Sequence, residues 1–239
     1  MNPIAVITGA SRGIGKEIAT LLASKGCDLV LCCQKSIDQL SSLAETLQTT
    51  YAVSVRFYQG NVADPHFAET LFADLPRVDY LINNAGISQI KLLTDTSYEE
   101  WKELMGVNVD GVFLCSKAAA KLMLKEHRGH ILNISSMWGQ SGASMEVAYS
   151  SSKGAVDAFT KALAKELAPS GIQVNALSLG FIDTEMNKHL SDEEREAFFD
   201  EIPSGRPGDP KEAAAMAWQI LTSPPYLTGQ VIRMDGGLL

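Results

Sequence analysis

The sequence predicts an α/β protein with a single doubly wound parallel sheet of about seven strands and helices on both faces. Two observations carry this prediction. Short apolar runs alternate along the chain with longer stretches whose apolar residues recur at helical spacing. The short runs are apolar almost throughout, as in strands that are buried on both faces of a parallel sheet.

These runs give the expected order of elements. The strands are expected at Ile4–Thr8, Leu29–Cys33, Val53–Tyr58, Tyr80–Ile82, Ile131–Ser135, Gln173–Ser178 and Gln230–Met234. The helices are expected at Gly13–Ser24, Ile37–Thr49, Pro65–Ala73, Tyr98–Lys125, Val147–Ala168 and Lys211–Thr222. Strands separated by helices run parallel through right-handed crossovers. We find no internal repeat and no linker rich in proline or glycine, so residues 1–239 are expected to form one domain.

One segment, at about 181–208, departs from this alternation because it is long, polar and charged. Ser191 followed by three acidic residues is typical of a helix start, and Pro203 and Pro207 are typical of stops. An insertion after the sixth strand lies at the carboxyl edge of the sheet, where sheets of this kind bind ligands. We expect a mobile substrate lid here; a surface helical hairpin is the alternative.

The composition excludes several classes of protein. The 239 residues are 46% apolar and 20% charged, which argues against disorder. A net charge of −8 opposes binding to nucleic acid, and the apolar runs are too short to span a membrane. The start of the chain does not resemble a secretion signal, so a cytoplasmic location is expected. The four cysteines lack metal-ligand spacing; we expect buried structural thiols and no metal site.

A glycine-rich turn follows the first strand and opens a helix. Its spacing, Gly-x-x-x-Gly-x-Gly, differs from the ordinary dinucleotide fingerprint, yet the same physics applies. Glycines allow a tight turn and close approach of a pyrophosphate, and the helix N-terminus supplies amide donors. The residues expected to contact a cofactor in this turn are Gly9, Ser11, Arg12, Gly13, Ile14 and Gly15.

The end of the second strand favours NADP(H) over NAD as this cofactor. Enzymes that use NAD place an acidic residue there to bind the ribose 2′-hydroxyl. This chain has Gln34-Lys35-Ser36 after its two cysteines and no acid. Lys35 and Arg12 can together bind a 2′-phosphate. The alternative is that both bases are simply solvated.

Tyr149 and Lys153 form the most informative pair in the sequence. Residues i and i+4 share a helix face, so the phenol and the ammonium are expected to point the same way. A nearby cation favours the phenolate and lowers the tyrosine pKa toward a useful range. Ser136, at the end of the fifth strand, can donate a hydrogen bond to a substrate carbonyl. Asn108, in the middle of an expected helix, can hold water or kink that helix.

Together with these residues, further motifs make the chain resemble the short-chain dehydrogenase/reductase family along essentially its whole length. The motifs are the turn at residues 8–15, Asn61-Val62, Asn83-Asn84-Ala85-Gly86 and Asp235-Gly236-Gly237. The resemblance implies a Rossmann-type NADP-binding domain and a catalytic tetrad. Tyr149 is then the proton donor, Ser136 orients the carbonyl oxygen, Lys153 lowers the tyrosine pKa and holds the nicotinamide ribose, and Asn108 anchors a relay water.

The resemblance also implies cofactor contacts elsewhere in the chain and a homotetramer. The contacting residues, beside Lys35 and the turn, are Asn61, Val62, Asn83, Ala85, Gly86, Tyr149, Lys153, Gly180, Ile182 and Thr184. Leu179 stands where the family usually has proline, which leaves that loop less constrained. The tetramer is expected on the helices Tyr98–Lys125 and Val147–Ala168.

Two substrate classes stay open within the family. One is the substrate of the 3-oxoacyl-[acyl-carrier-protein] reductases, although their usual Arg-Asp pair after residue 88 is missing here. Residues 135–149 resemble more closely the reductases that convert the 5-aminopentanone group on a lysine of elongation factor P to 5-aminopentanol. A substrate amine can pair with Glu146, and its chain can stack on Trp138. Glu146 can instead cap a backbone amide. A broad carbonyl or hydroxysteroid dehydrogenase and a non-catalytic subunit are further alternatives.

Overall fold

A computed structural model describes residues 2–187 and 191–239 and confirms the predicted doubly wound parallel sheet. The strands are β1 (Ile4–Thr8), β2 (Asp28–Cys33), β3 (Val55–Gln59), β4 (Tyr80–Asn83), β5 (Gly129–Ser136), β6 (Ile172–Leu179) and β7 (Val231–Met234). They lie in the order β3-β2-β1-β4-β5-β6-β7, and every neighbouring pair is parallel.

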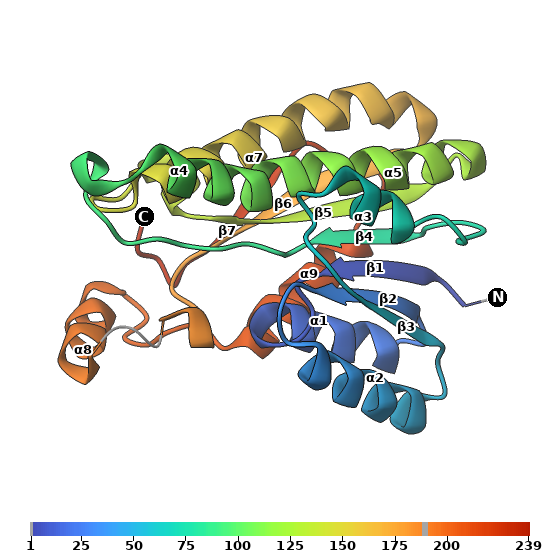
Figure 1. The fold of residues 1–239 in the computed structure, drawn as a ribbon, viewed down its shortest axis with the longest axis horizontal. Coiled ribbons are helices and arrows are strands. Elements are labelled where there is room, and N and C mark those ends of the chain that lie inside the picture. Colours follow the sequence, from blue (N-terminus) through green and yellow to red (C-terminus); the bar gives the residue numbers. More distant parts are fainter. Residues whose placement is uncertain (1, 188–190) are drawn as a thin grey trace.

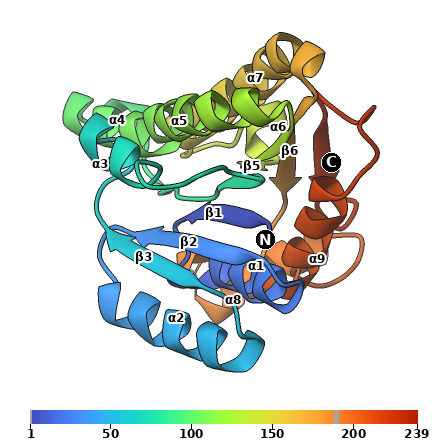
Figure 2. The ribbon, with the colours of Figure 1, turned by 90° about the vertical axis from the view of Figure 1, so that its right-hand side faces the viewer.

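Helices cover both faces of this sheet. The longer ones are α1 (Gly13–Ser24), α2 (Ile37–Tyr51), α4 (Tyr98–Met105), α5 (Gly111–Glu126), α7 (Val147–Leu167), α8 (Asp192–Glu201) and α9 (Pro210–Leu221), and the short ones are α3 (Pro65–Thr70) and α6 (Trp138–Ser141). In Figure 1, α3, α4, α5 and α7 lie above the sheet, and α1, α2 and α9 lie below it. Figure 2 shows the same layers from the side. One apolar core fills each interface between sheet and helices.

The expected helix Tyr98–Lys125 was wrong as a single α-helix. The chain changes at Gly106–Asp110 to a π-helical turn, which separates α4 from α5 and contains Asn108. Such turns insert one residue into the helical repeat and often mark functional sites. The helix expected at Pro65–Ala73 ends early, at Thr70, and the short helix α6 was not expected. The helix start at Ser191 is confirmed by its capping box with Glu194.

The strands have their carboxyl ends on the side where α8 lies (left in Figure 1), and a cleft lined by the turn after β1 and by the ends of β5 and β6 opens there. Thr8, the last residue of β1, fastens one edge of this cleft. Its buried hydroxyl accepts hydrogen bonds from the backbone amides of Asn84 and Ala85, both at 3.0 Å. The Asn84 side chain donates in return to the carbonyls of Thr8 and Gly9 at 3.0 and 2.9 Å. The ends of β1 and β4 are therefore tied together.

All four cysteines, Cys27, Cys32, Cys33 and Cys115, are buried free thiols. Burial raises the pKa of Cys27 to about 11 and that of Cys115 to about 12, so both stay protonated near neutrality. No helix within the described parts of the chain is both long enough and apolar enough to cross a membrane.

Replacing Thr8 with Val is expected to lower the free energy of unfolding by about 1–3 kcal/mol, because two amides lose their acceptor while the side-chain shape is kept. Urea denaturation measures the change. Thr20→Val is the matched control, since the Thr20 hydroxyl bonds only within its own helix, to the Lys16 carbonyl. Equal stability of the two variants would contradict the role given to Thr8.

Candidate active site

The cleft consists of two adjoining cavities. The first, the Tyr149 cavity, has a volume of about 270 Å³ and is lined by Ser136, Trp138, Glu146, Tyr149 and Lys153, among others. The second, the glycine-loop cavity, has a volume of about 430 Å³ and lies against the turn after β1. The two share the lining residues Ile14, Asn84, Gly86, Ser88, Thr184 and Met186. A ligand can therefore extend from one cavity into the other.

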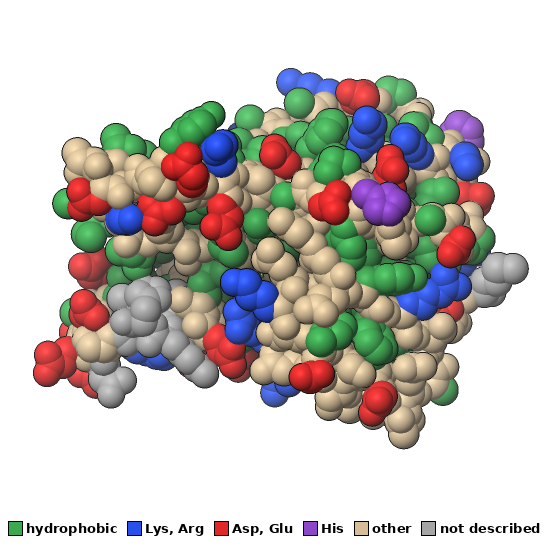
Figure 3. Space-filling model, in the orientation of Figure 1, with side chains coloured by type: hydrophobic (Ala, Val, Ile, Leu, Met, Phe, Trp, Pro, Cys, Tyr) green, Lys and Arg blue, Asp and Glu red, His purple; other side chains and the backbone are tan. Residues whose placement is uncertain are grey.

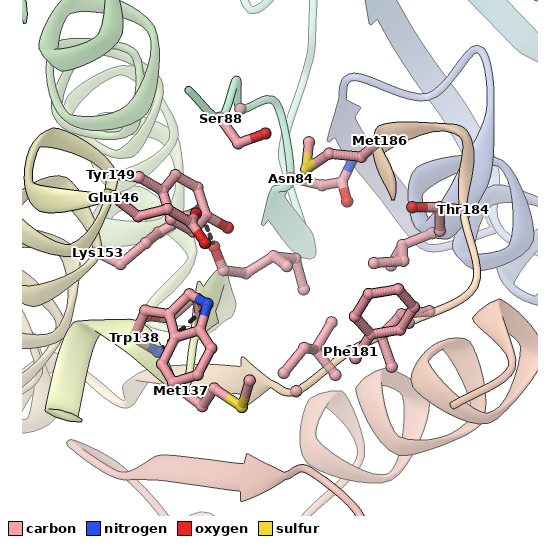
Figure 4. Close-up of a pocket in the computed structure, with 18 of the residues that line it drawn as sticks. Asn84, Ser88, Met137, Trp138, Glu146, Tyr149, Lys153, Phe181, Thr184 and Met186 are labelled. Carbon is pink, nitrogen blue, oxygen red and sulfur yellow. Dashed lines mark hydrogen bonds between the residues drawn. The ribbon is translucent and has the colours of Figure 1, made fainter. Parts of the chain in front are cut away.

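Ser136 and Tyr149 meet in the first cavity. Ser136 is the last residue of β5, and Tyr149 lies in the first turn of α7. In Figure 4, Tyr149, Glu146 and Lys153 line one side of the cavity, and Phe181, Thr184 and Met186 line the other. Burial raises the pKa of Tyr149 to about 12; a hydrogen bond with the Ser136 hydroxyl lowers it, and the nearby charge of Glu146 raises it. The phenol is thus protonated at neutral pH.

Lys153 lies one helical turn further along α7, on the face shared with Tyr149. Its side chain is buried, and its Nζ donates a hydrogen bond of 2.9 Å to the carbonyl of Ile134 in β5. The same Nζ lies 5.6 Å from the centre of the Tyr149 ring. Burial lowers the pKa of Lys153 to about 8, and the charge of Asp157 raises it. The largest influence on the pKa of Tyr149 is burial, so the lowering expected from the Lys153 charge does not prevail.

Asn108 lies behind this cavity rather than in its lining. Its Nδ2 donates to the Ile87 carbonyl at 2.9 Å and to the Ser152 hydroxyl at 3.0 Å, and its Oδ1 accepts from the Ile87 amide at 2.9 Å. The π-helical turn aims the side chain inward, where it is buried. Asn108 thus joins the loop after β4 to α7. A Cβ on Gly86 would lie 3.4 Å from its Oδ1 and 3.6 Å from Lys153 Nζ, in ordinary van der Waals contact with both groups.

The turn after β1 packs so closely against the rest of the protein that two of its positions require glycine. Gly9 has φ +66°, and a Cβ on it would lie 2.8 Å from the Cα of Ala85. A Cβ on Gly15 would lie 2.3 Å from the Gly9 carbonyl oxygen. Glycine is therefore required at both positions by packing within the protein. The turn leads directly into α1, whose N-terminal amides favour an anion.

The residues predicted to contact the cofactor fall into three groups. Those that line the glycine-loop cavity are Gly9, Ser11, Arg12, Gly13, Ile14, Lys35, Asn61, Val62, Ala85, Gly86 and Thr184. Gly180 and Ile182 line the Tyr149 cavity with Tyr149 and Lys153. Two lie outside both linings: Gly15 packs beneath the turn, and Asn83 is buried, with its Nδ2 bonded to Ser116 and Asn133. The first two groups line adjoining cavities, where they are placed to hold an extended ligand.

Asn84 belongs to the stretch 83–86 that was expected at the cofactor, whereas the lid residues that line the site were not singled out from the sequence. Asn84 lines both cavities, and its place beside Asn83 in one motif is the signal that points to it. Phe181, Met186 and Phe198 line the Tyr149 cavity from the segment expected to be a lid. Their spacing in a polar stretch of the sequence does not indicate that they line a cavity. Residues 188–190 of the expected lid lie outside the described residues.

Helix α8 packs on the segment that follows β6. The ring of Phe181 lies 5.0 Å from that of Phe198 and 5.5 Å from that of Phe199, measured between centroids. Arg195 pairs with Asp183 at 2.8 Å. Closer to the turn after β1, Arg12 pairs with Glu185 at 3.1 Å, which links the lid segment to the glycine-loop cavity. Within residues 2–187 and 191–239, no group of three His, Cys, Asp or Glu side chains is placed to hold a metal ion.

Known proteins are similar to this chain in both sequence and fold. The pattern of the short chain dehydrogenase family matches residues 3–195. An oxidoreductase of Bacillus subtilis named YmfI, described as uncharacterized, is 38% identical over 239 residues, with 99% of each chain covered. The 3-oxoacyl-acyl-carrier-protein reductase FabG of Vibrio cholerae is 36% identical over 240 residues, covering 98% of this chain and 96% of the relative. A crystal structure of a short-chain type dehydrogenase/reductase from Mycobacterium marinum superposes with a TM-score of 0.91 at 33% identity, covering 99% of this chain and 95% of that one.

A match of this extent, in sequence and in structure, shows that the chain belongs to the short chain dehydrogenase family and is an oxidoreductase that uses a nicotinamide cofactor to interconvert an alcohol and a carbonyl group.

Proposed function

We propose that the protein uses NADPH to reduce a ketone to a secondary alcohol, and that this ketone is the 5-aminopentanone group on a lysine of elongation factor P. The reduction rests on one observation: the Ser136–Tyr149 pair opens into a cavity that continues into the glycine-loop cavity. The choice of substrate rests on the carboxylate of Glu146 in the same cavity.

The side chains of the Tyr149 cavity supply a proton and hold the carbonyl. A nicotinamide cofactor supplies the hydride when bound. The Tyr149 phenol donates its proton to the carbonyl oxygen, and the raised pKa of Tyr149 keeps that proton available at neutral pH. The Ser136 hydroxyl, bonded to the phenol, orients the same oxygen. The Lys153 ammonium stabilises the negative charge left on the phenolate.

The preference for NADPH is supported by the charges at the glycine-loop cavity. Arg12 and Lys35 both line it, and the turn after β2 contributes Gln34 and Ser36 rather than an acid. A guanidinium and an ammonium on one wall favour a ligand with an additional phosphate.

A positively charged substrate is supported by the surroundings of Tyr149. Glu146 lies close enough for its charge to raise the Tyr149 pKa, and it lines the same cavity as Tyr149. Trp138 lines the same cavity and offers an aromatic face. Figure 3 shows acidic side chains gathered on the side of the molecule where α4 and α8 lie. Helix α8 alone has six acidic residues and one basic residue. This field favours the approach of a cationic group.

A second candidate is the reduction of 3-oxoacyl groups on an acyl carrier protein. It is favoured by the relatives of that name, which are 34–38% identical to this chain.

We further propose a homotetramer built on α5 and α7, because Phe113, Leu124 and Val147 expose large apolar side chains on these helices.

Tyr149→Phe is expected to lower kcat by about 10²–10⁴-fold, because the ring is kept and the donated proton is lost. NADPH oxidation with an aminoketone measures the change. Tyr80→Phe is the matched control, since Tyr80 packs near His130 and Trp218 and lines neither cavity of the cleft. Retention of wild-type turnover by Tyr149→Phe would contradict the proposed proton donor.

The double substitution Arg12→Ala and Lys35→Ala is expected to raise KM for NADPH about tenfold or more and to leave KM for NADH nearly unchanged. The reason is that the two charge-assisted bonds removed are made to the 2′-phosphate, which only NADPH has. Initial rates with both cofactors measure the ratio. Lys16→Ala, which removes an exposed base outside the cavity, serves as control. Equal effects on the two cofactors would refute the proposed 2′-phosphate contact.

Glu146→Gln is expected to lower kcat/KM about tenfold or more for a small aminoketone, and to leave kcat/KM nearly unchanged for an alkyl ketone of equal length. The reason is that only the first substrate loses a charge-assisted bond. Glu103→Gln, an exposed change on α4, controls for the overall acidity. If Glu146→Gln affects the two ketones equally, the proposed recognition of the amine is wrong.

A further inference from the structure

An ionisable side chain that the proposed chemistry does not use lies one helical turn beyond Lys153. Asp157 is buried, with 5% of its surface exposed, as is Lys153. The Ser135 hydroxyl donates a hydrogen bond of 2.5 Å to its Oδ1. Its Oδ2 is fully buried and has no hydrogen-bond partner among the described residues. A carboxyl group in such a position needs a compensating interaction.

Lys153 and Asp157 are anchored to consecutive residues of the same strand. Lys153 Nζ binds the carbonyl of Ile134, and Asp157 accepts from the side chain of Ser135. Their spacing of four residues puts both on the face of α7 that packs against β5. The ammonium and the carboxyl group therefore lie in the same buried layer, and the charge of Asp157 acts on Lys153 without a direct ion pair between them. Ser136, the next residue of the strand, bonds to Tyr149.

We propose that Asp157 is a positioning residue for Lys153: its carboxylate, anchored to β5 through Ser135, supplies the negative charge that holds the buried Lys153 ammonium beside the ring of Tyr149. The inference concerns the reduction step and does not depend on which ketone is the substrate. Asp157 acts only through Lys153, since it lines neither cavity of the cleft.

The other groups around Lys153 do not supply this charge. The loop after β4 contributes Gly86, and the π-helical turn contributes the neutral amide of Asn108. Strand β5 contributes the Ile134 carbonyl, and α7 itself contributes Tyr149, whose phenol is protonated near neutrality. Glu146 acts on Tyr149. The charge of Asp157 opposes the effect of burial on the Lys153 pKa. Burial raises the pKa of Asp157 itself, whereas the hydrogen bond from Ser135 and the charges of Lys161 and Lys153 lower it.

Asp157→Asn tests the proposal through the pH dependence of kcat/KM, measured with NADPH and the neutral ketone ethyl acetoacetate. Asparagine keeps the shape and an acceptor for Ser135 but removes the charge. The loss of a nearby anion lowers the pKa of a lysine, so the alkaline limb of the profile is expected to move to lower pH by about one unit. Activity at the acid end of the range, where Lys153 is protonated in both proteins, is expected to fall much less.

A double variant, Ser135→Ala with Asp157→Leu, provides a second test in case Asp157→Asn does not fold. It removes both partners of the buried bond together, and so leaves no unsatisfied polar atom from that pair. The same displacement of the limb is expected. Thr160→Val is the matched control, because Thr160 also makes a buried hydrogen bond between α7 and β5, with Asn133, but is uncharged.

A limb displaced in the Asp157 variants and unmoved in Thr160→Val supports the proposal. If kcat/KM falls equally at every pH in the Asp157 variants, Asp157 has only a structural role and the proposal is overturned. An unchanged limb in the double variant overturns it as well. If the wild-type protein does not reduce amine substrates, but the limb is displaced as expected in the Asp157 variants on ethyl acetoacetate, the proposed substrate is refuted and the role of Asp157 stands.

Discussion

The bond between the buried Lys153 ammonium and the Ile134 carbonyl is the interaction on which the geometry of the site depends. It fixes the start of α7 against the end of β5, and so sets Tyr149 opposite Ser136. A buried ammonium is costly unless it is paired and hydrogen-bonded. The hydrogen bond to Ile134 meets part of this cost, and the Ser135–Asp157 pair lies in the same polar layer between α7 and β5.

The parallel sheet also connects this polar layer to the glycine turn after β1. The turn after β1 and the loop after β4 meet at the same edge, where Thr8 and Asn84 join them. Asn108 then connects the loop after β4 to α7 through Ile87 and Ser152. A continuous set of hydrogen bonds thus runs from the glycine turn to the helix that holds Tyr149. The cleft is shaped mainly by rigid elements, and only the wall that contains Phe181 and Met186 comes from the segment after β6.

Strong periodic patterns made the sheet predictable, and local spacing made Tyr149 and Lys153 predictable. The features that the sequence did not predict depend on geometry that the residue pattern does not encode. A π-helical turn shifts the repeat by a single residue, so Tyr98–Lys125 had the pattern of one helix. Neighbouring asparagines look alike in sequence, yet Asn83 faces the core and Asn84 faces the cleft. Asp157 went unnoticed because burial beside Lys153 depends on packing against β5. The pKa of Tyr149 likewise depends on burial as well as on the spacing of charges.

The most direct test of the substrate is to incubate the protein and NADPH with elongation factor P in its ketone form, and to follow the factor by intact mass. Acetoacetyl thioester is offered to the same enzyme in a parallel assay of NADPH oxidation. We predict that the factor gains two hydrogen atoms while the thioester is turned over slowly. Rapid reduction of the thioester with no change in the mass of the factor would contradict recognition of the amine and assign the protein to 3-oxoacyl reduction.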